Sequence, residues 1–328
     1  MQHQDWNWCS LSEHIDVQQV RDNPDRTWYK QGLSCNRGIT IYDVDNLVLP
    51  DTIGYWGWWN ISIHIDMQQV RDNPDREWCR RGLSINSRLT IHDVDNLVLP
   101  NATKYWTWRY LSEYINVQQV RDNPYRTWCR ESLSQNRGLT VHDVDNLVLP
   151  NATGDWSWYY LSQHIDMHQV RDNPDRPWHK QGLSCNPSIT VHDVDNLILP
   201  HAASGWCWYD VSRHINVQQV RQNPNREWYI QGLSCNKDIT LEDIDNLVLP
   251  NAIGYWNYFY MSMHSDMKVI RQNPHRQWST HFLSSNKDIT VHDVDLLSIG
   301  AQMTLYRDTL TLCVNRSVYT DIDIVCTN

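Results

Sequence analysis

Asp16–Trp28 reads DVQQVRDNPDRTW, and close copies of this stretch return five more times at a spacing of 50 residues. The copies stay in register, so that every copy has Trp at the position of Trp28 and Pro at that of Pro24. No insertion breaks the frame between residue 1 and about residue 297. A fixed period of this length is typical of solenoids and propellers, in which each unit packs on its neighbours. We therefore expect function to reside on a surface rather than in one pocket.

Each copy contains two signals for the start of a helix. In the first half, Asp16 can cap a helix, Gln19 can cap back, and apolar residues flank the start on both sides. In the second half Thr40 takes the cap position and Asp43 the third helical position. Every copy has a good cap residue at both places, so each copy is predicted to be a doublet of about 25 residues.

A shorter aromatic helix is predicted before each capped helix, over residues 6–12 and about 26–34 of the first copy. Asn23-Pro24 is expected to close one helix and open the next, and Pro50 to do the same at the end of the copy. This gives about four short helices per copy, which must be stabilised by stacking because they are too short to persist alone. A β-propeller is disfavoured because the apolar spacing from Val17 to Val20 is helical.

The predicted fold is all-α, an elongated α-solenoid of short helix pairs with six 50-residue repeats over residues 1–297. Residues 298–328 are predicted to form a degenerate half-repeat that caps the C-terminal end. Within them Thr304–Arg307 resembles Thr27–Lys30, and Asn315–Val318 resembles Asn36–Ile39.

Charge and composition favour a cytoplasmic protein with protein partners. The formal net charge of -10 disfavours a general binder of nucleic acid or of anionic membranes. Apolar runs are too short to span a bilayer, and Met1–Asn7 lacks the features of a secretory signal. The nine cysteines include no CxxC pair, and they are interpreted as free thiols.

Asn173–Thr190 reads NPDRPWHKQGLSCNPSIT. The NPDxPW turn, the following LSxN and the NPxIT helix start resemble the tandem repeats of giant DNA viruses of the mimivirus type, and the likeness extends over residues 1 to about 297. The resemblance implies a viral protein with an all-helical repeat fold, located in the host cytoplasm or in the virion. It implies no activity and no catalytic residues.

Two patterns could suggest a metal site. The HDVDN segment places His92 beside Asp93 and recurs in other copies, but its first member has Tyr42 and its fifth has Glu242, which a row of ligands would not tolerate. His164 and His168 are four residues apart, as two ligands on one helical turn would be, but no other copy repeats the pair. We predict no metal, no cofactor and no enzymatic activity, since no nucleophile or phosphate-binding motif occurs either.

Arginine recurs at the positions of Arg21 and Arg26 in all six copies, close to the Trp28 position. Such rows could clamp the bases of RNA, one per copy. The favoured interpretation is that they pair with rows of aspartate at the positions of Asp43 and Asp45, because sequence readout would require variation between copies. The tryptophans are likewise expected to form core rather than a binding platform.

Partner contacts are expected where the copies differ. Two adjacent variable positions carry bulky aromatic and Arg residues of the kind favoured at interfaces, although either row could instead reflect drift in packing. The predicted binding residues are Trp59, Arg109, Tyr159, Tyr209 and Phe259 in one row and Tyr110, Tyr160 and Tyr260 in the other. We expect a non-catalytic scaffold that binds a viral or host protein, with a structural component of the particle or, less favoured, a nucleic-acid-binding array as the alternatives.

Overall fold

The computed structural model describes residues 6–50, 52–274 and 276–300. This part of the chain contains 24 α-helices, four in each copy, and confirms the predicted all-α repeat architecture. None of these helices is long and apolar enough to cross a membrane. Below, the copies are called repeats one to six, and the contact between two neighbouring repeats is called a seam.

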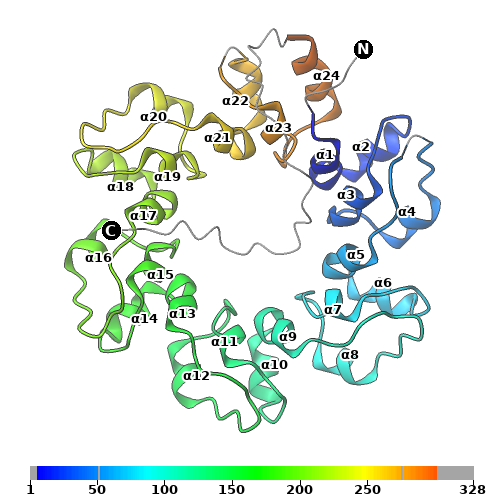
Figure 1. The fold of residues 1–328 in the computed structure, drawn as a ribbon, viewed down its shortest axis with the longest axis horizontal. Coiled ribbons are helices and arrows are strands. Elements are labelled where there is room, and N and C mark those ends of the chain that lie inside the picture. Colours follow the sequence, from blue (N-terminus) through cyan, green and yellow to red (C-terminus); the bar gives the residue numbers. More distant parts are fainter. Residues whose placement is uncertain (1–5, 51, 275, 301–328) are drawn as a thin grey trace.

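The first and third helices of each repeat form the inner layer of the molecule (Figure 1). The first helices are α1 (Trp8–His14), α5 (Trp58–His64), α9 (Trp108–Tyr114), α13 (Trp158–His164), α17 (Trp208–His214) and α21 (Tyr258–His264). The third helices are α3 (Lys30–Cys35), α7 (Arg80–Leu83), α11 (Arg130–Leu133), α15 (Lys180–Ser184), α19 (Ile230–Ser234) and α23 (Thr280–Leu283).

The second and fourth helices form the outer layer (Figure 1). The second helices are α2 (Val17–Asp22), α6 (Met67–Asp72), α10 (Val117–Asp122), α14 (Met167–Asp172), α18 (Val217–Gln222) and α22 (Met267–Gln272). The fourth helices are α4 (Ile41–Asn46), α8 (Ile91–Asn96), α12 (Val141–Asn146), α16 (Val191–Asn196), α20 (Leu241–Asn246) and α24 (Val291–Gly300).

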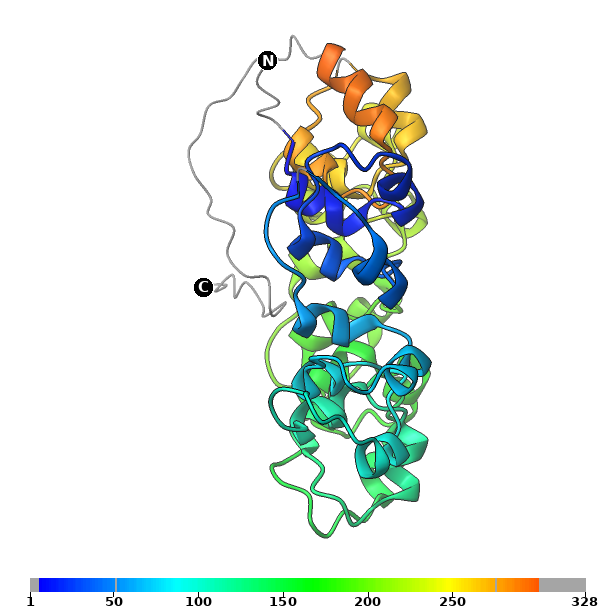
Figure 2. The ribbon, with the colours of Figure 1, turned by 90° about the vertical axis from the view of Figure 1, so that its right-hand side faces the viewer.

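The six repeats close into a flat ring, in which repeat six packs against repeat one (Figures 1 and 2). The closing seam repeats several side-chain hydrogen bonds of an internal seam. Asn7 N donates to Ser284 Oγ at 3.1 Å, as Gly57 N donates to Ser34 Oγ at 2.8 Å. Val291 N donates to the side chain of Gln19 at 3.0 Å. The α-solenoid is therefore closed rather than elongated as expected from the sequence, because the turn between neighbouring repeats accumulates to a full circle after six copies.

The core of each repeat is centred on the Trp28 position. Trp28 is fully buried, its indole N–H donates to Asn23 O at 2.8 Å, and its ring meets that of Trp8 edge-on at 5.6 Å. The same hydrogen bond occurs in all six repeats. The tryptophan row is thus structural core, as predicted, and satisfies its polar atom internally.

The LSxN motif joins the helices within and between repeats. Asn36 is buried, and its amide donates to Ser12 O at 3.1 Å and Ile15 O at 2.7 Å, at the C-terminal end of α1. The Ser34 hydroxyl donates to Lys30 O and accepts the backbone N–H of the next repeat. Both polar residues satisfy backbone groups that would otherwise be buried without a partner.

The predicted cap at Thr40 is confirmed, whereas two other local predictions are wrong. Thr40 and Asp43 form a capping box in α4. Pro24 lies in a turn and does not open a helix, and α3 begins at Lys30 because Tyr29 is held extended by a parallel bridge to Ile53 of the next repeat. Pro50 likewise lies in a turn, and residues 52–57 before α5 are not helical.

The glutamine of the first capped helix has a different role from the one predicted. Asp16 does cap α2, accepting from Gln18 N. Gln69, the equivalent of Gln19 in repeat two, does not cap back but accepts the Ile41 N–H of the preceding repeat at 2.9 Å. This row of glutamines therefore clamps the seams.

The end of repeat six differs from the others because α24 continues to Gly300. Residues 298–300 thus belong to its last helix. The rest of the predicted C-terminal cap lies outside the described residues, and that prediction stays a prediction.

Candidate functional site

The predicted binding residues lie on inner helices, at the second or third position of the first helix in repeats two to six (Figure 1). Phe259 is 54% exposed, Tyr260 is 39% exposed, and Arg109 is also exposed. The remaining five are half-buried: Trp59, Tyr110, Tyr159, Tyr160 and Tyr209. The structure therefore places these residues on one layer of the ring, spread over five repeats.

Several of the half-buried members pack against neighbouring inner helices. Tyr159 meets His179 edge-on at 5.0 Å between ring centres. The Tyr110 hydroxyl accepts from the guanidinium of Arg81 in the preceding repeat at 2.9 Å, and that guanidinium also lies over the Tyr110 ring. Some residues of the variable rows thus contribute to packing between helices, whereas others are exposed on the surface.

Repeat six carries an aromatic cluster that departs from the pattern. The chain has two phenylalanines, Phe259 and Phe282, and they stack with ring centres 5.7 Å apart and planes 15° from parallel. Tyr260 and His281 contact Phe282 edge-on. Neither α21 nor α23 contains a charged residue of the Asp, Glu, Lys or Arg type. We call Phe259, Tyr260, His281 and Phe282 the aromatic cluster.

Phe282 occupies a position where four repeats have glycine. At Gly32, Gly82, Gly182 and Gly232 an added Cβ would lie 2.3–2.6 Å from a backbone carbonyl oxygen of the first helix. The inner helices of those repeats can therefore pack closely, and those of repeat six must be arranged differently. Sequence reasoning placed Phe259 and Tyr260 in the candidate site but missed Phe282 and His281; the loss of a recurring glycine was the signal that could have found them.

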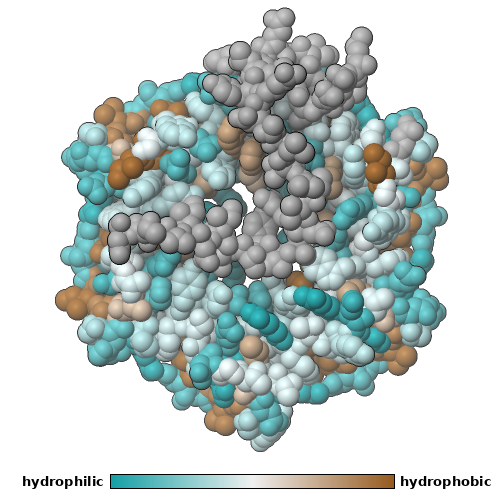
Figure 3. All heavy atoms as spheres, viewed as in Figure 1, coloured by the Kyte–Doolittle hydropathy of each residue, from teal (hydrophilic) through white to brown (hydrophobic). Residues whose placement is uncertain are grey.

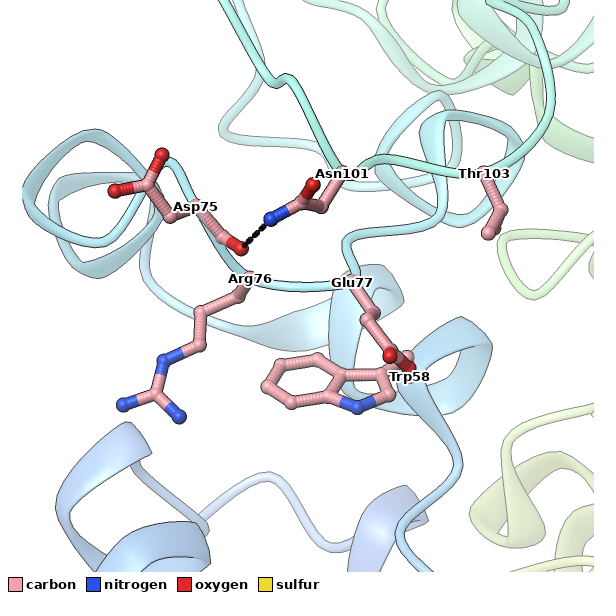
Figure 4. Close-up of a pocket in the computed structure, with 6 residues that line it drawn as sticks. All are labelled: Trp58, Asp75, Arg76, Glu77, Asn101 and Thr103. Carbon is pink, nitrogen blue, oxygen red and sulfur yellow. Dashed lines mark hydrogen bonds between the residues drawn. The ribbon is translucent and has the colours of Figure 1, made fainter.

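A shallow polar pocket lies between repeats two and three, lined by Trp58, Asp75, Arg76, Glu77, Asn101 and Thr103 (Figure 4). Arg76 is engaged by Asp45 at 2.5 Å, and Asn101 donates to Asp75 O at 2.6 Å. The Thr103 backbone pairs with Trp78 and Arg80. Several polar groups of the pocket thus hold the fold together, and Asp75 and Glu77 add carboxylates to its lining. The lining combines the recurring Trp and Arg rows with residues that vary, and sequence reasoning did not single it out.

The arginine rows are paired with aspartate, as predicted. Arg21 donates to both carboxylate oxygens of Asp43 within its repeat, at 2.8 and 2.9 Å. Arg76 pairs with Asp45 of the preceding repeat. The equivalent arginine–aspartate pairs recur around the ring. Burial by itself would raise the pKa of Asp43, but hydrogen bonds from Arg21 and Thr40 lower it. Both rows of guanidinium groups are therefore already neutralised by the fold.

The two metal-like patterns do not form ligand sets. His92 is exposed and its Nδ1 lies 3.1 Å from the amide of Asn96. His164 ends α13 whereas His168 belongs to α14, and the break at Ile165 separates them. Within the described ranges no group of three or more His, Cys, Asp or Glu side chains is placed to hold a metal ion.

The cysteines of the described ranges form no disulfide, in line with the interpretation from the sequence. Burial raises the pKa of the Cys35 and Cys185 thiols to about 12. Thiols of this kind are poor nucleophiles at neutral pH, because the thiolate is the reactive form.

The outer edge of the ring exposes single aliphatic side chains rather than a continuous patch. Repeats one to five each have an aliphatic residue that is 75–79% exposed at the position of Val48: Val48, Val98, Val148, Ile198 and Val248. Figure 3 shows apolar surface in separate places along this edge, with polar surface between them. Isolated apolar residues are normal on soluble proteins, so this edge is not the preferred candidate.

Comparison of the chain with models of protein families, with curated proteins and with solved structures finds no match.

Proposed function

We propose that this chain is a non-catalytic ring-shaped scaffold that binds a protein partner through its inner layer of helices. The observation that supports this is how the recurring and the varying positions are used. Recurring residues such as Trp28, Arg21 and Asn36 are occupied by core packing and by hydrogen bonds of the fold. The varying positions of the inner helices leave aromatic and Arg side chains exposed instead.

The exposed members have the chemistry of interface anchors. Phe259 and Tyr260 belong to the aromatic cluster, and Arg109 is exposed on α9. Aromatic residues and arginine dominate binding energy at protein interfaces because they supply a large contact area. Repeat arrays suit this task, since they present extended surfaces built from local contacts.

The likeness of the repeat to giant-virus tandem repeats extends the proposal to a viral origin. The partner would then be a viral or a host protein, met in the host cytoplasm. A structural role in the particle is the alternative, and recovery of the chain in purified virions at a fixed copy number would favour it.

The test is affinity purification of the tagged full-length chain from cells that produce it, with and without nuclease, followed by mass spectrometry. The Phe259→Ala/Tyr260→Ala variant is compared with Val148→Ser, which changes the exposed outer edge. We expect a partner that survives nuclease, is lost in the inner-layer variant and is retained in the outer-edge control. Retention of every partner by both variants would contradict binding through the inner layer. Loss of all partners on nuclease treatment would favour nucleic acid as the ligand.

A further inference from the structure

The seam between repeats five and six lacks a clamp that five other seams share. In those seams a glutamine side chain accepts the first N–H of the fourth helix of the preceding repeat, at 2.7–3.0 Å: Gln69 from Ile41, Gln119 from Ile91, Gln169 from Val141, Gln219 from Val191, and Gln19 from Val291. The closing seam is among them. Repeat six has Val269 at this position, and an isopropyl group cannot accept the Leu241 N–H.

Packing at the same seam is also looser. Leu241 is half-buried, whereas its equivalents Ile41, Ile91, Val141, Val191 and Val291 are buried. Leu249 is half-buried as well, whereas Leu49, Leu99, Leu149 and Leu199 are buried. Lost burial of apolar side chains lowers the free energy that holds two elements together. Two independent features thus weaken the contact between repeats five and six.

A histidine makes a hydrogen bond across this seam, and only one neutral tautomer of its ring can do so. His264 Nε2 lies 2.8 Å from Ser234 O of repeat five and must carry the proton, because a carbonyl oxygen only accepts. His264 Nδ1 is buried and has no partner among the described residues. A second proton would therefore place a buried N–H without an acceptor at the seam.

The charges around His264 also oppose a second proton. Burial lowers the pKa of His264 and Lys237 of repeat five lowers it further, although the bond to Ser234 raises it. Neither α19 nor α21 carries an Asp, Glu, Lys or Arg residue, and the nearby Asp266 caps α22 by accepting from Lys268 N. Because the closed seam disfavours the protonated form, its stability falls as the pH drops through the ordinary range of histidine, about 6.5.

We propose that the ring opens at the seam between repeats five and six, and that protonation of His264 favours the opening. The closing seam between repeats six and one stays shut, although no peptide bond joins its two sides directly. It retains the glutamine clamp, which is the difference between the two seams, because the pairing of Arg26 with Asp295 is matched by that of Arg276 with Asp245. This inference does not depend on the proposed partner binding.

Hydrogen exchange of the full chain, followed by mass spectrometry, tests the site of opening. The fourth helices α12 and α16 have the same sequence, but their flanking residues differ, with Val148 after the first and Ile198 after the second. Peptides that extend into these flanks allow each of the six segments to be followed separately. We expect residues 240–247 to exchange faster than the equivalent segments of the other repeats, by about tenfold for one missing hydrogen bond. Val269→Gln should remove the difference, and Gln219→Val should create a similar fast segment at residues 190–197. Equal protection of all six segments, or no response to either substitution, would overturn the proposal.

The acid dependence is tested with His264→Gln, whose amide can still donate to Ser234 O but does not titrate. In the unmodified chain we expect the protection of residues 240–247, corrected for intrinsic exchange, to fall several-fold more between pH 7 and pH 5 than that of residues 90–97, whose seam has Tyr114 at the position of His264. The variant should lose this extra fall, whereas His142→Gln, on the exposed face of α12, should keep it. If His264→Gln leaves the additional loss of protection at acid pH unchanged, protonation of His264 does not favour the opening, even if the ring does open at this seam.

Discussion

Arg26 and Asp295 are separated by 269 residues, yet the Arg26 guanidinium donates two hydrogen bonds to the Asp295 carboxylate, at 2.9 and 2.7 Å. The same pairing joins Arg76 to Asp45 across an internal seam, at 2.8 and 2.5 Å. The last and first repeats are thus paired in the same way as two repeats that are consecutive in the sequence. Every repeat has its two faces covered by other repeats, which removes the exposed ends that an open solenoid must protect.

Closure of the ring predicts an energetic coupling between Arg26 and Asp295. Arg26→Asp should place two carboxylates side by side and lower the free energy of unfolding by about 1 kcal/mol, because the pair is partly exposed. Adding Asp295→Arg to this variant should restore the free energy of unfolding. A double-mutant cycle by chemical denaturation measures the coupling, and the Arg76 and Asp45 pair is its control. A coupling near zero for the first pair, with a clear coupling for the second, would mean that the ring is open in solution.

Loss of one core tryptophan should be severe. Trp178 is fully buried, donates to Asn173 O at 2.8 Å and meets Trp158 edge-on at 5.1 Å. Trp178→Ala should lower the free energy of unfolding by roughly 3–5 kcal/mol. Trp158→Ala should cost less, because Trp158 is only half-buried. An unchanged melting temperature for Trp178→Ala would contradict the assignment of this row to the core.

The close approach of the inner helices predicts that the recurring glycine cannot be replaced without cost. An added Cβ at Gly82 would lie 2.6 Å from Trp59 O and 2.9 Å from Ser62 Cβ. Gly82→Ala should therefore force the helices apart and destabilise the protein by about 1–3 kcal/mol in thermal or chemical unfolding. Gly205→Ala is the control, since nothing lies within 4 Å of its added Cβ. Similar losses for the two variants would show that crowding is not the cause.

The buried aspartates predict that the ring unfolds in acid. Burial alone would raise the pKa of Asp143, but hydrogen bonds from Arg121 and Thr140 outweigh it and hold the pKa at about 2. An unfolded aspartate has a pKa of about 3.9, so the unfolded chain binds protons first. The stability from this group is complete above that value and is lost as the pH falls from about 4 toward 2.

The variant Asp143→Asn separates this contribution from general acid effects. It should lower the free energy of unfolding by about 1–3 kcal/mol at neutral pH and reduce its slope between pH 4 and pH 2. Asp145→Asn should cost under about 1 kcal/mol, because Asp145 pairs with Arg176 at a partly exposed site. An unchanged acid slope in Asp143→Asn would contradict the assignment.

The inner position of the variable rows could be predicted only in part. The sequence identified the positions that vary, and the aromatic and Arg side chains at them. It did not reveal that Tyr110 would bind Arg81, or that Phe259 would stack on Phe282 from another helix. Those contacts depend on how α21 faces α23 and how α7 faces α9, which is set by packing over distances longer than any local pattern.

The sequence by itself determined the units of this protein. The 50-residue period, the caps at Asp16 and Thr40 and the apolar spacing within each copy are local, and they fix four short helices wherever the copy occurs. The pairing of arginine with aspartate rows also followed from the sequence, because opposite charges recurred with the same period.

Only the tertiary structure decided that the array closes and that its seams are unequal. Closure depends on the angle between neighbouring repeats, which many small packing contacts set together, and a small change in that angle would have given an open superhelix. The role of Gln19 shows the same limit: its side chain matches a local capping pattern, yet it accepts the N–H of Val291 from the far end of the chain. The local sequence determines which donor and acceptor groups are present, whereas the geometry of the whole ring determines which of them form a hydrogen bond.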